Sequence, residues 1–392
     1  MKLRTIRGIN IQNKKVLLRV DFNVAFDERG RILDDFRVRA EVPSARALLK
    51  KGAKLVIIAH LGRPVKGQEK KYSMRKVAQH FAKLLGKPVY FGCMDDQKTI
   101  ERIGKMKRGE IVFLENIRFF PEEEKNDAAF ACRLAALGDI YVNDAFAVSH
   151  RAHASVHAIT KYLPSYAGET LERECNALSR IVHNPKRPLT VIVGGAKIST
   201  KMELIRFFMK KGGADHVIVG GALANTVLLA QGIAVGKSLV EKDMVSDVKK
   251  LDITGARIHL PCDVVVGRGK KAARPAIRPV EKVGKTEAIY DIGPYTAEMF
   301  RNIIVRSRMV IWNGPMGFFE KKPFARGTHF IARAVIESKA FSIIGGGETA
   351  AVLDAMGIAG KFSHISTGGG AMMEFLAGKK LPALSVLIKK KT

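Results

Sequence analysis

The stretch FSIIGGGET at residues 341–349 decides the fold of the second half, together with HISTGGG at residues 364–370. In both, a short apolar run typical of a buried strand ends in a glycine cluster, and a helix-like segment follows. Glycine lets backbone amides approach an anion closely, and the first turn of a helix adds unpaired N–H donors. The two turns therefore predict a phosphate-binding site at the ends of neighbouring strands.

Length and composition predict a two-domain protein without a membrane span. The chain has 392 residues, of which 47% are hydrophobic, and this length exceeds that of one average domain. The first ten residues are charged, and no run approaches 18 apolar residues, so we expect a cytoplasmic protein. Four scattered cysteines without a CxxC pair favour free thiols over disulfides or zinc.

The charge is unusual. With 67 Lys and Arg against 37 Asp and Glu, the formal net charge is +30, which attracts polyanions and anionic metabolites. Because the basic residues are dispersed and no aromatic platforms accompany them, we expect no specific nucleic-acid partner. Non-specific polyanion binding remains open, since anionic substrates alone leave part of the surplus unexplained.

Strand-like and helix-like segments alternate along the chain, which predicts parallel α/β sheets covered on both faces, with ligands at the strand carboxyl ends. The predicted strands are 15–19, 55–59, 111–114, 140–143, 189–193, 216–219, 309–312 and 341–344. The predicted helices include 37–50, 74–85, 201–210 and 324–338.

The domain boundaries follow from a polar, helix-favouring segment in the middle of the chain. We expect an α/β protein of two doubly wound domains, 1–167 and 186–370, joined by an interdomain helix at 168–185. Residues 371–392 end in a basic, proline-interrupted tail that could either fray or pack back on the first half.

In the first half, polar side chains follow the predicted strands at equivalent points. Four arginines could clamp a small polyanion there by bidentate pairing, and an aspartate and an asparagine could bind its hydroxyl groups. These candidates are Arg37, Arg63, Arg118, Arg151, Asp21 and Asn23. The nearby histidines at 150, 153 and 157 lack a cysteine or carboxylate to complete a zinc site.

In the second half, the strand at 189–193 runs into GGAK at 194–197. Lys197 and Lys201 lie one helical turn apart and repel each other unless solvent or an anion lies between them. The pair Gly220–Gly221 offers flat backbone for a planar ring, and Glu320 could bind ribose hydroxyls.

Two nucleotide-like patterns are rejected. Residues 232–238 resemble a Walker A loop but have three residues, rather than four, between the glycines, so we expect a plain loop. Residues 345–350 fit the dinucleotide pattern, but no acidic residue ends the next strand.

Seven motifs closely resemble those of the phosphoglycerate kinase family of glycolysis, in family order across nearly the whole chain. They are RVDFNV at 19–24, HLGRP at 60–64, ENIRF at 115–119, HRAH at 150–153, GGAK at 194–197, WNGPMG at 312–317 and STGGG at 366–370.

The resemblance implies two Rossmann-like domains separated by a cleft, with 3-phosphoglycerate on the first, Mg²⁺ and ATP or ADP on the second, and the tail 371–392 packing on the first. The implied phosphoglycerate ligands are Asp21, Asn23, Arg37, His60, Arg63, Arg118 and Arg151. The implied nucleotide and phosphate ligands are Lys197, Lys201, Asn313, Glu320, Gly346, Gly347, Glu348, Thr349, Thr367, Gly368 and Gly369, with Gly195, Gly220 and Gly221 near adenine.

The implied activity is reversible phosphoryl transfer between 1,3-bisphosphoglycerate and ADP, giving 3-phosphoglycerate and ATP, in glycolysis and gluconeogenesis. Transfer would be in line, without a covalent enzyme intermediate, after hinge closure. We expect Arg37, Lys197 and the amides of Gly347 and Gly370 to act on the transferring group, and we expect a monomer.

The chain departs from the family pattern at the metal ligand, where Glu348 replaces the usual aspartate. Two rival interpretations are a nucleic-acid-binding protein that uses the surplus charge and a kinase-like scaffold that has lost catalysis.

Overall fold

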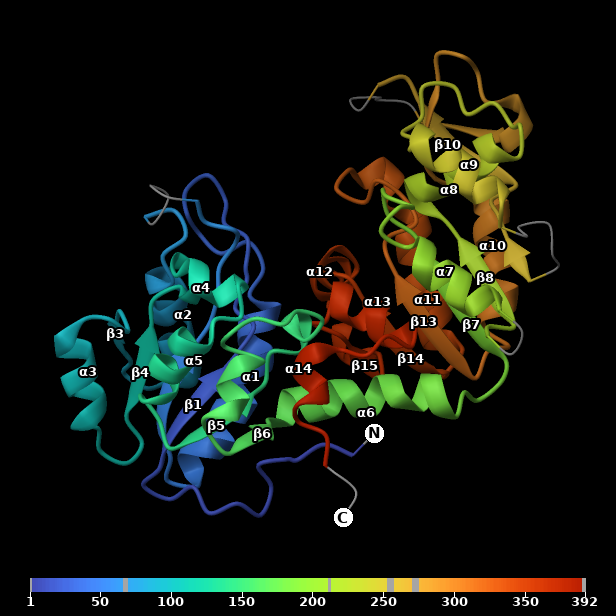
Figure 1. Ribbon diagram of the computed structural model, residues 1–392. Helices are drawn as coiled ribbons and strands as arrows, with labels where there is room; N and C mark the ends of the chain where they lie inside the picture. The colour runs from blue at the N-terminus through green and yellow to red at the C-terminus, as the bar shows by residue number, and fades with distance from the viewer. Residues whose placement is uncertain (1, 66–69, 211–212, 252–256, 270–274, 390–392) are drawn as a thin grey trace. The chain divides into compact units, whose positions relative to one another are not determined.

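The computed structural model describes residues 2–65, 70–210, 213–251, 257–269 and 275–389 (Figure 1). The chain forms two compact units, Met1–Asn176 with Lys379–Thr392, and Ala177–Gly378. Helix α6 (Glu169–His183) covers the predicted linker and runs from the first unit into the second. Residues 390–392, at the end of the predicted tail, lie outside the described residues. In the described part of the chain, no helix combines the length and apolar character needed to span a bilayer.

The first unit contains a six-stranded parallel sheet in the order β3-β4-β2-β1-β5-β6. Its strands are β1 (Lys15–Arg19), β2 (Lys54–Ile58), β3 (Tyr90–Gly92), β4 (Ile111–Leu114), β5 (Ile140–Asn143) and β6 (Ser165–Ala167). Its other helices are α1 (Phe36–Lys50), α2 (Arg75–Leu85), α3 (Gln97–Gly104), α4 (Pro121–Glu124), α5 (Ala128–Ala135) and α14 (Pro382–Ser385).

Both faces of this sheet are buried, as the continuous apolar strands predict. Val16 and Leu18 of β1 pack in one core with Phe81 of α2, whereas Leu17 points the other way and packs in a second core with Leu134 of α5. Because successive side chains of a strand alternate between faces, a sheet with helices on both sides needs apolar residues at every position. Because the strands are parallel, their carboxyl ends all lie at one edge of the sheet, and the loops at this edge can carry polar groups.

The C-terminal tail packs on the first unit. The Arg4 backbone N–H donates to the Leu387 carbonyl at 2.8 Å, and the Ala383 N–H donates to the Ser149 carbonyl at 3.2 Å. Ala383 is fully buried against Ala145 and Val148, which follow β5. Residues 371–378, by contrast, group with the second unit, where α13 contacts α7.

The second unit has its own six-stranded parallel sheet, in the order β15-β14-β13-β7-β8-β9. Its strands are β7 (Leu189–Val193), β8 (His216–Val219), β9 (Ile258–His259), β13 (Met309–Asn313), β14 (Phe341–Gly345) and β15 (His364–Ile365). Its helices are α7 (Met202–Met209), α8 (Gly221–Ala230), α9 (Val245–Lys249), α10 (Pro294–Ile304), α11 (Arg326–Glu337), α12 (Gly347–Ala355) and α13 (Gly370–Leu376).

A three-stranded antiparallel sheet, which the sequence analysis did not predict, also belongs to this unit. Its strands β10 (Asp263–Gly267), β11 (Ala276–Pro279) and β12 (Ala288–Ile292) lie in the order β11-β10-β12. Val264 and Val266 of β10 pack in a small core with Leu228 of α8. This sheet therefore stands beside α8, at the carboxyl end of β8.

The main core of the second unit surrounds Trp312, the only tryptophan of the chain. Trp312 and Phe300 are both fully buried in this core, and Phe300 comes from α10. The indole N–H donates to the Gly314 carbonyl at 2.8 Å, so the ring also holds the turn that follows β13.

We expect Phe300→Ala to lower the free energy of unfolding by about 3–5 kcal/mol, because it removes a buried ring and leaves a cavity. Tyr295→Ala is the matched control, since Tyr295 lies on the same helix and is 72% exposed. The measurement is the urea midpoint of Trp312 fluorescence, which reports on this unit. Equal midpoints for the two variants would contradict the assigned core.

Candidate active site

The first candidate site lies at the carboxyl edge of the first sheet, where the loops after β1, β2 and β4 are hydrogen-bonded to one another. The Asn23 side-chain oxygen accepts the Gly62 N–H at 2.8 Å, and the Asn116 side-chain oxygen accepts the Leu61 N–H at 3.2 Å. The Arg118 guanidinium donates to the Gly62 carbonyl at 2.6 Å. These bonds explain why polar residues follow three separate strands, because they fix the loops to one another.

Arg37 is held at this edge by a carboxylate. Its guanidinium donates to Asp21 at 2.7 Å; the Asp21 side chain is 2% exposed, and the Arg37 side chain is 26% exposed. A buried carboxylate orients a guanidinium more firmly than an exposed one, because solvent screens the pair less. Arg37 thus has a fixed anchor while part of its guanidinium remains accessible.

Arg118 lies among other cations. Burial, followed by the charges of Arg151 and Arg19, lowers the pKa of its guanidinium to about 10. Glu124, whose carboxylate lies 3.3 Å from the Arg118 guanidinium, opposes this effect. The carboxylates near Arg118 therefore neutralise only part of the positive charge of the surrounding arginines.

His60 lies within the same cluster of arginines. It is 3% exposed, and burial is the main reason that its pKa lies well below the usual range. The charges of Arg19, Arg118, Arg37 and Arg151 all act in the same direction. The imidazole is consequently neutral at physiological pH.

The tautomer of His60 follows from its neighbour. The Arg19 guanidinium, which can only donate, lies 3.2 Å from the His60 Nδ1. The Nδ1 must then accept, which leaves the proton of the neutral ring on Nε2. His60 therefore presents an N–H donor on the side away from Arg19.

Arg19 is itself supported from behind by a buried network. Its Nε donates to the Ser155 hydroxyl at 2.9 Å, and that hydroxyl donates to the Glu123 carboxylate at 2.6 Å. Arg19 and Glu123 are almost completely buried. The sequence analysis quoted Arg19 within a motif but gave it no role, because nothing in the local pattern links it to Ser155 or Glu123.

Six of the seven predicted phosphoglycerate ligands are thus brought together at one edge. They are Asp21, Asn23, Arg37, His60, Arg118 and Arg151. Arg63 lies on the same loop as Gly62, is exposed, and makes no ion pair with any residue that the structure describes.

The second candidate site lies at the carboxyl edge of the second sheet. The Gly194 N–H donates to the Asn313 carbonyl at 2.9 Å, and the Gly195 N–H donates to the Pro315 carbonyl at 2.8 Å. The Gly314 N–H donates to the Thr349 hydroxyl at 2.9 Å. The turns after β7, β13 and β14, which the sequence analysis treated as separate motifs, are therefore joined.

Lys201 lies in this junction. Its ammonium donates to the Asn313 backbone carbonyl at 3.1 Å and also to the Asn313 side-chain oxygen. Burial lowers the pKa of the ammonium to about 8, while the Glu348 carboxylate acts in the opposite direction. Lys197, in contrast, is exposed, and its charge acts on Glu241. The prediction that the two lysines lie one helical turn apart is wrong, because α7 begins only at Met202, and the two side chains have different surroundings.

Gly347 begins α12 and is unusual among the glycines of the site. A Cβ at this position would meet no atom within 4 Å, and its φ is not in the left-handed region. Gly346, which precedes it, has a φ of 92° and needs to be glycine for its backbone conformation. The backbone conformation therefore explains the glycine at 346, whereas neither backbone conformation nor steric contact requires one at 347.

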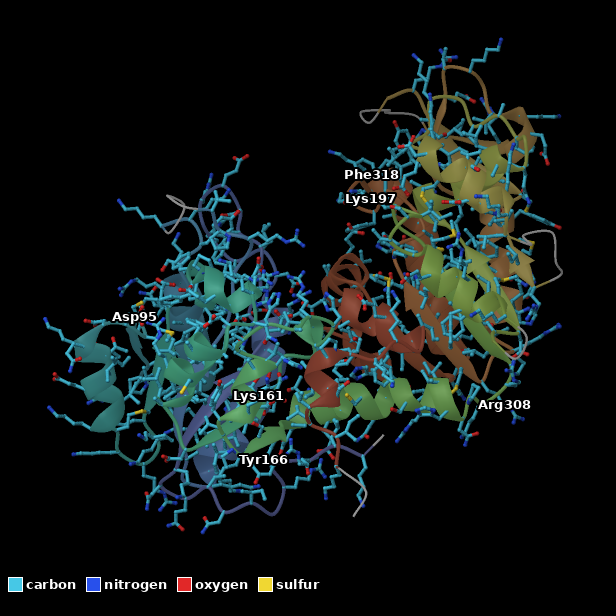
Figure 2. All side chains as sticks on the ribbon, viewed as in Figure 1. Asp95, Lys161, Tyr166, Lys197, Arg308 and Phe318 are labelled. Carbon is cyan, nitrogen blue, oxygen red and sulfur yellow. The ribbon has the colours of Figure 1, made fainter. Side chains whose placement is uncertain are left out.

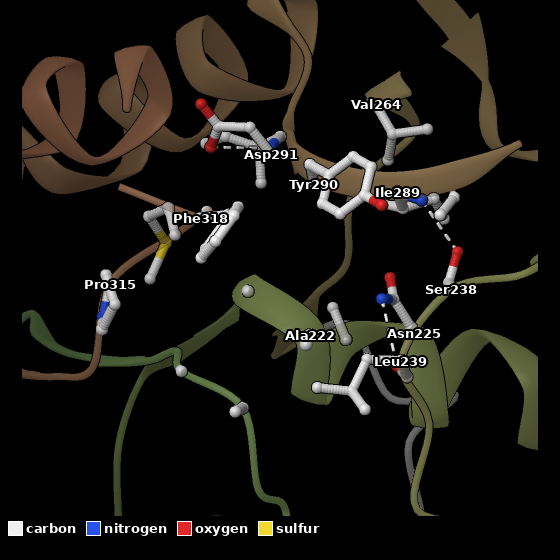
Figure 3. A pocket seen from close by; sticks show the side chains of 18 of the residues that line it. Ala222, Asn225, Ser238, Leu239, Val264, Ile289, Tyr290, Asp291, Pro315 and Phe318 are labelled. Carbon is white, nitrogen blue, oxygen red and sulfur yellow. Dashed lines mark hydrogen bonds between the residues drawn. The ribbon is translucent and has the colours of Figure 1, made fainter. Parts of the chain in front are cut away.

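A pocket of about 560 Å³ opens beside this edge, between α8 and the antiparallel sheet (Figure 3). Four predicted nucleotide ligands line it: Gly195, Gly221, Glu320 and Glu348. Gly220 is not part of the lining, and a Cβ there would lie 2.5 Å from the Met316 sulfur, so Gly220 permits close packing.

The sequence analysis missed the apolar walls of this pocket. They come from four separate segments and look like ordinary core residues in the sequence; they include Leu239, Val264, Ile289, Tyr290 and Phe318. The loop at 232–238, rejected as a Walker A motif, contributes Lys237 and Ser238 to the lining. The Ser238 hydroxyl accepts the Ile289 N–H at 2.8 Å, which ties this loop to β12.

Asp291 fixes one end of the pocket. It is 2% exposed, and burial raises the pKa of its carboxyl to about 7. The carboxylate accepts the Gly327 N–H at 2.7 Å, and a Cβ at Gly317 would lie 2.3 Å from it. It therefore holds the start of α11 close to the turn that carries Phe318 and Glu320.

Glu348 is the only predicted metal ligand. It is exposed in the first turn of α12 and lines the pocket. The described residues contain no cluster of three or more histidine, cysteine or acidic side chains that could hold a metal by themselves. Mg²⁺ in phosphotransferases is held by one or two carboxylates together with substrate phosphates and water, so a single carboxylate at this place fits that ion.

Comparisons with known proteins agree with this arrangement. The family model described as phosphoglycerate kinase matches residues 6–379. The phosphoglycerate kinase of Coprothermobacter proteolyticus is 44% identical over 99% of both chains, and that of Pelotomaculum thermopropionicum is 44% identical over the full length of both.

The solved structures that this chain resembles are also phosphoglycerate kinases. The phosphoglycerate kinase of Pyrococcus horikoshii is 33% identical with a TM-score of 0.89, and that of Coxiella burnetii is 36% identical with a TM-score of 0.83; each match covers 98% of both chains. This chain therefore belongs to the phosphoglycerate kinase family, whose members transfer a phosphoryl group reversibly between 1,3-bisphosphoglycerate and ADP in glycolysis.

Proposed function

We propose that the first unit binds 3-phosphoglycerate at its carboxyl edge and that the second unit binds ATP or ADP in the 560 Å³ pocket. The main support for this assignment is that four guanidinium groups surround the buried, neutral His60 and help to lower its pKa. They belong to Arg19, Arg37, Arg118 and Arg151. Such a concentration of charge suits a small, highly charged anion. The pocket of the second unit has apolar walls and suits a planar base instead.

At the first site, the partly exposed Arg37 and the exposed Arg63 provide charge, and the His60 Nε2–H provides a neutral donor. Arg118 and Arg151 add further positive charge. Asp21 and Asn23 supply oxygen acceptors for hydroxyl groups of the substrate. The substrate's negative charge would relieve the repulsion among the arginines, which supports binding of a polyanion in preference to a neutral sugar.

At the second site, the adenine would lie near Gly195 and Gly221 against the apolar walls, with Gly220 supporting the packing behind it. Glu320 would accept ribose hydroxyls. The phosphates would lie toward the lysines and the two helix starts, at residues that carry backbone amides or polar side chains. These residues are Lys197, Lys201, Asn313, Gly346, Gly347, Thr349, Thr367, Gly368, Gly369 and Gly370.

Glu348 would hold Mg²⁺, which, when bound, offsets the negative charge of the nucleotide phosphates. The glutamate is one methylene longer than aspartate, and its exposed position leaves room for that extra reach. Its carboxylate also raises the proton affinity of Lys201, so the two residues act together on the charge of the pocket.

Transfer would use charge placed in advance and no covalent intermediate. In-line phosphoryl transfer leaves negative charge on the equatorial oxygens of the moving group, and fixed cations and amides stabilise that charge. We assign this role to Arg37, Lys197 and the amides of Gly347 and Gly370. Because both ligand sets come from one chain, we also propose that the enzyme works as a monomer, and its glycolytic role favours the cytoplasm.

The assignment predicts that Arg37→Ala and Lys197→Ala each lower kcat about a hundredfold, since losing one charged donor to the transition state costs on the order of 3 kcal/mol. The measurement is a coupled assay of ATP consumption with 3-phosphoglycerate. Arg39→Ala is the control, because Arg39 lies on the same helix but forms an exposed pair with Asp35. Rates equal to that of the wild type in both test variants would refute the assignment.

Gly347→Ala should raise the KM for ATP about tenfold or more while leaving the melting temperature unchanged. The methyl group would meet no protein atom, but it would obstruct an anion at the start of α12, costing about the strength of one charged hydrogen bond. Gly360→Ala is the control, since its Cβ would also meet nothing and its φ is not left-handed. Unchanged KM values for both variants would speak against phosphate binding at this turn.

Nucleotide affinity should also depend on pH through Lys201. Because the ammonium has a pKa of about 8, it loses its charge as the pH rises from 7.5 to 9.5, and the Kd for ADP should increase about tenfold. Lys201→Arg keeps its charge over this range and should bind ADP with little dependence on pH. Titration calorimetry tests this, and identical pH profiles for the two proteins would remove Lys201 from the phosphate site.

A further inference from the structure

A second concentration of positive charge lies at the opposite edge of the first sheet, where the strands begin. Eight basic residues gather there on the ends of α1, β1 and β2 and on the loop before β4, and we refer to them as the amino-edge patch. They are Lys14, Lys15, Lys50, Lys51, Lys54, Lys105, Lys107 and Arg108. Six of them are exposed, and Lys15 and Lys54 are partly buried.

Backbone hydrogen bonds hold these segments together. The Lys54 N–H donates to the Lys14 carbonyl at 2.9 Å, and the Gly109 N–H donates to the Ala53 carbonyl at 3.1 Å. Lys15 and Lys54 are register partners on neighbouring parallel strands, which places their backbones about 5 Å apart. The three segments therefore form one rigid surface.

The Arg108 side chain joins this surface from the loop before β4. Its Nε lies 2.8 Å from the position that a Cβ of Gly52 would occupy, next to Lys51. The cations of the loop and those at the end of α1 are therefore neighbours in space.

The charge of the patch is not neutralised within the described part of the chain, where none of the eight side chains forms an ion pair. Two acidic residues lie nearby, but each is already engaged. Asp139 accepts the backbone N–H of Lys15 at 2.7 Å. Glu110 pairs with Arg102 at 3.0 Å and accepts the backbone N–H of Lys107 at 2.8 Å.

Catalysis does not account for this cluster, because the substrate arginines lie at the carboxyl edge of the same parallel sheet. Like charges so close together repel and weaken the folded state unless an external anion lies among them. Substrate binding leaves part of the net charge of +30 unexplained, and some of that part lies in this patch.

We propose that the amino-edge patch binds the phosphate backbone of double-stranded nucleic acid, without regard to base sequence. A duplex carries about one negative charge per 1.7 Å of its axis, which suits several cations fixed on an open surface. The patch contains no aromatic ring on which a single-stranded base could stack. None of its eight residues is apolar, so the patch itself supplies no anchor of the kind that a stable contact with an acidic protein would need.

The test uses the full-length enzyme and a labelled 20-base-pair DNA duplex of mixed sequence, with binding followed by fluorescence anisotropy between about 50 and 200 mM salt. The variant replaces four exposed members of the patch: Lys14→Gln, Lys51→Gln, Lys107→Gln and Arg108→Gln. The matched control replaces four exposed, unpaired lysines of the second unit: Lys249→Gln, Lys282→Gln, Lys285→Gln and Lys361→Gln. Both variants carry the same net charge. Each titration is run without and with saturating 3-phosphoglycerate, which blocks the catalytic arginines.

The patch variant should bind the duplex more than tenfold more weakly at 100 mM salt. The slope of log K against log salt should become shallower by about 3 to 4, because each phosphate contact contributes about 0.9. The control variant should bind nearly as tightly as the wild type, and both variants should retain kinase activity within about twofold, which shows that they are folded.

Three results would overturn the proposal. Equal weakening in the two variants would show that the overall charge, and not the patch, attracts the duplex. Competition by 3-phosphoglycerate that abolishes binding would place the duplex at the catalytic edge. A wild-type protein that does not bind the duplex at 50 mM salt would exclude the interaction altogether.

Discussion

The structure of the first unit depends on keeping several guanidinium groups close together in a place with little water. Three of them are held by an oxygen of the protein: Arg37 by Asp21, Arg118 by the Gly62 carbonyl, and Arg19 by Ser155. Burial makes these contacts stronger than they would be at the surface, because solvent screens them less. The proposed substrate site is therefore already organised without a ligand, and gathering the charges lowers the free energy of unfolding.

The nucleotide site proposed for the second unit would bind anions in a different way. It relies on backbone amides at helix starts and on turns that interlock through glycine, with Lys201 as a partly neutralised cation whose ammonium is bonded to Asn313. A nucleotide has an apolar base and a charged tail, so one end of its site must exclude water while the other binds phosphate. The antiparallel sheet supplies the apolar wall, and the parallel sheet supplies the amides.

Much of the fold could be predicted from the sequence. The eight predicted strands are found within one residue at each end, because strands buried on both faces appear as continuous apolar runs. The antiparallel sheet was missed although β10 and β12 contain apolar runs, and its strand at Ala276–Pro279 is short, only partly buried and ends in proline. No local signal distinguishes such a strand from a loop.

The candidate sites were less visible than the fold. Residues that follow strands in recognisable motifs were named correctly as neighbours at one edge, although their roles in binding remain predictions. Arg19 was missed because its partners, Ser155 and Glu123, are more than a hundred residues away in sequence. The pocket walls were missed because Leu239 and Phe318 do not differ from core residues until the chain is folded.

The contact between Gly220 and Met316 has a consequence for how this fold can evolve. A Cβ at position 220 would come within 2.5 Å of the methionine sulfur, so neither residue can grow while the other keeps its size. A larger residue at 220 becomes tolerable only when the side chain at 316 shrinks or bends away. A change at 220 therefore displaces the buried Met316 side chain, and a mutational path that changes 220 first passes through a less well packed intermediate.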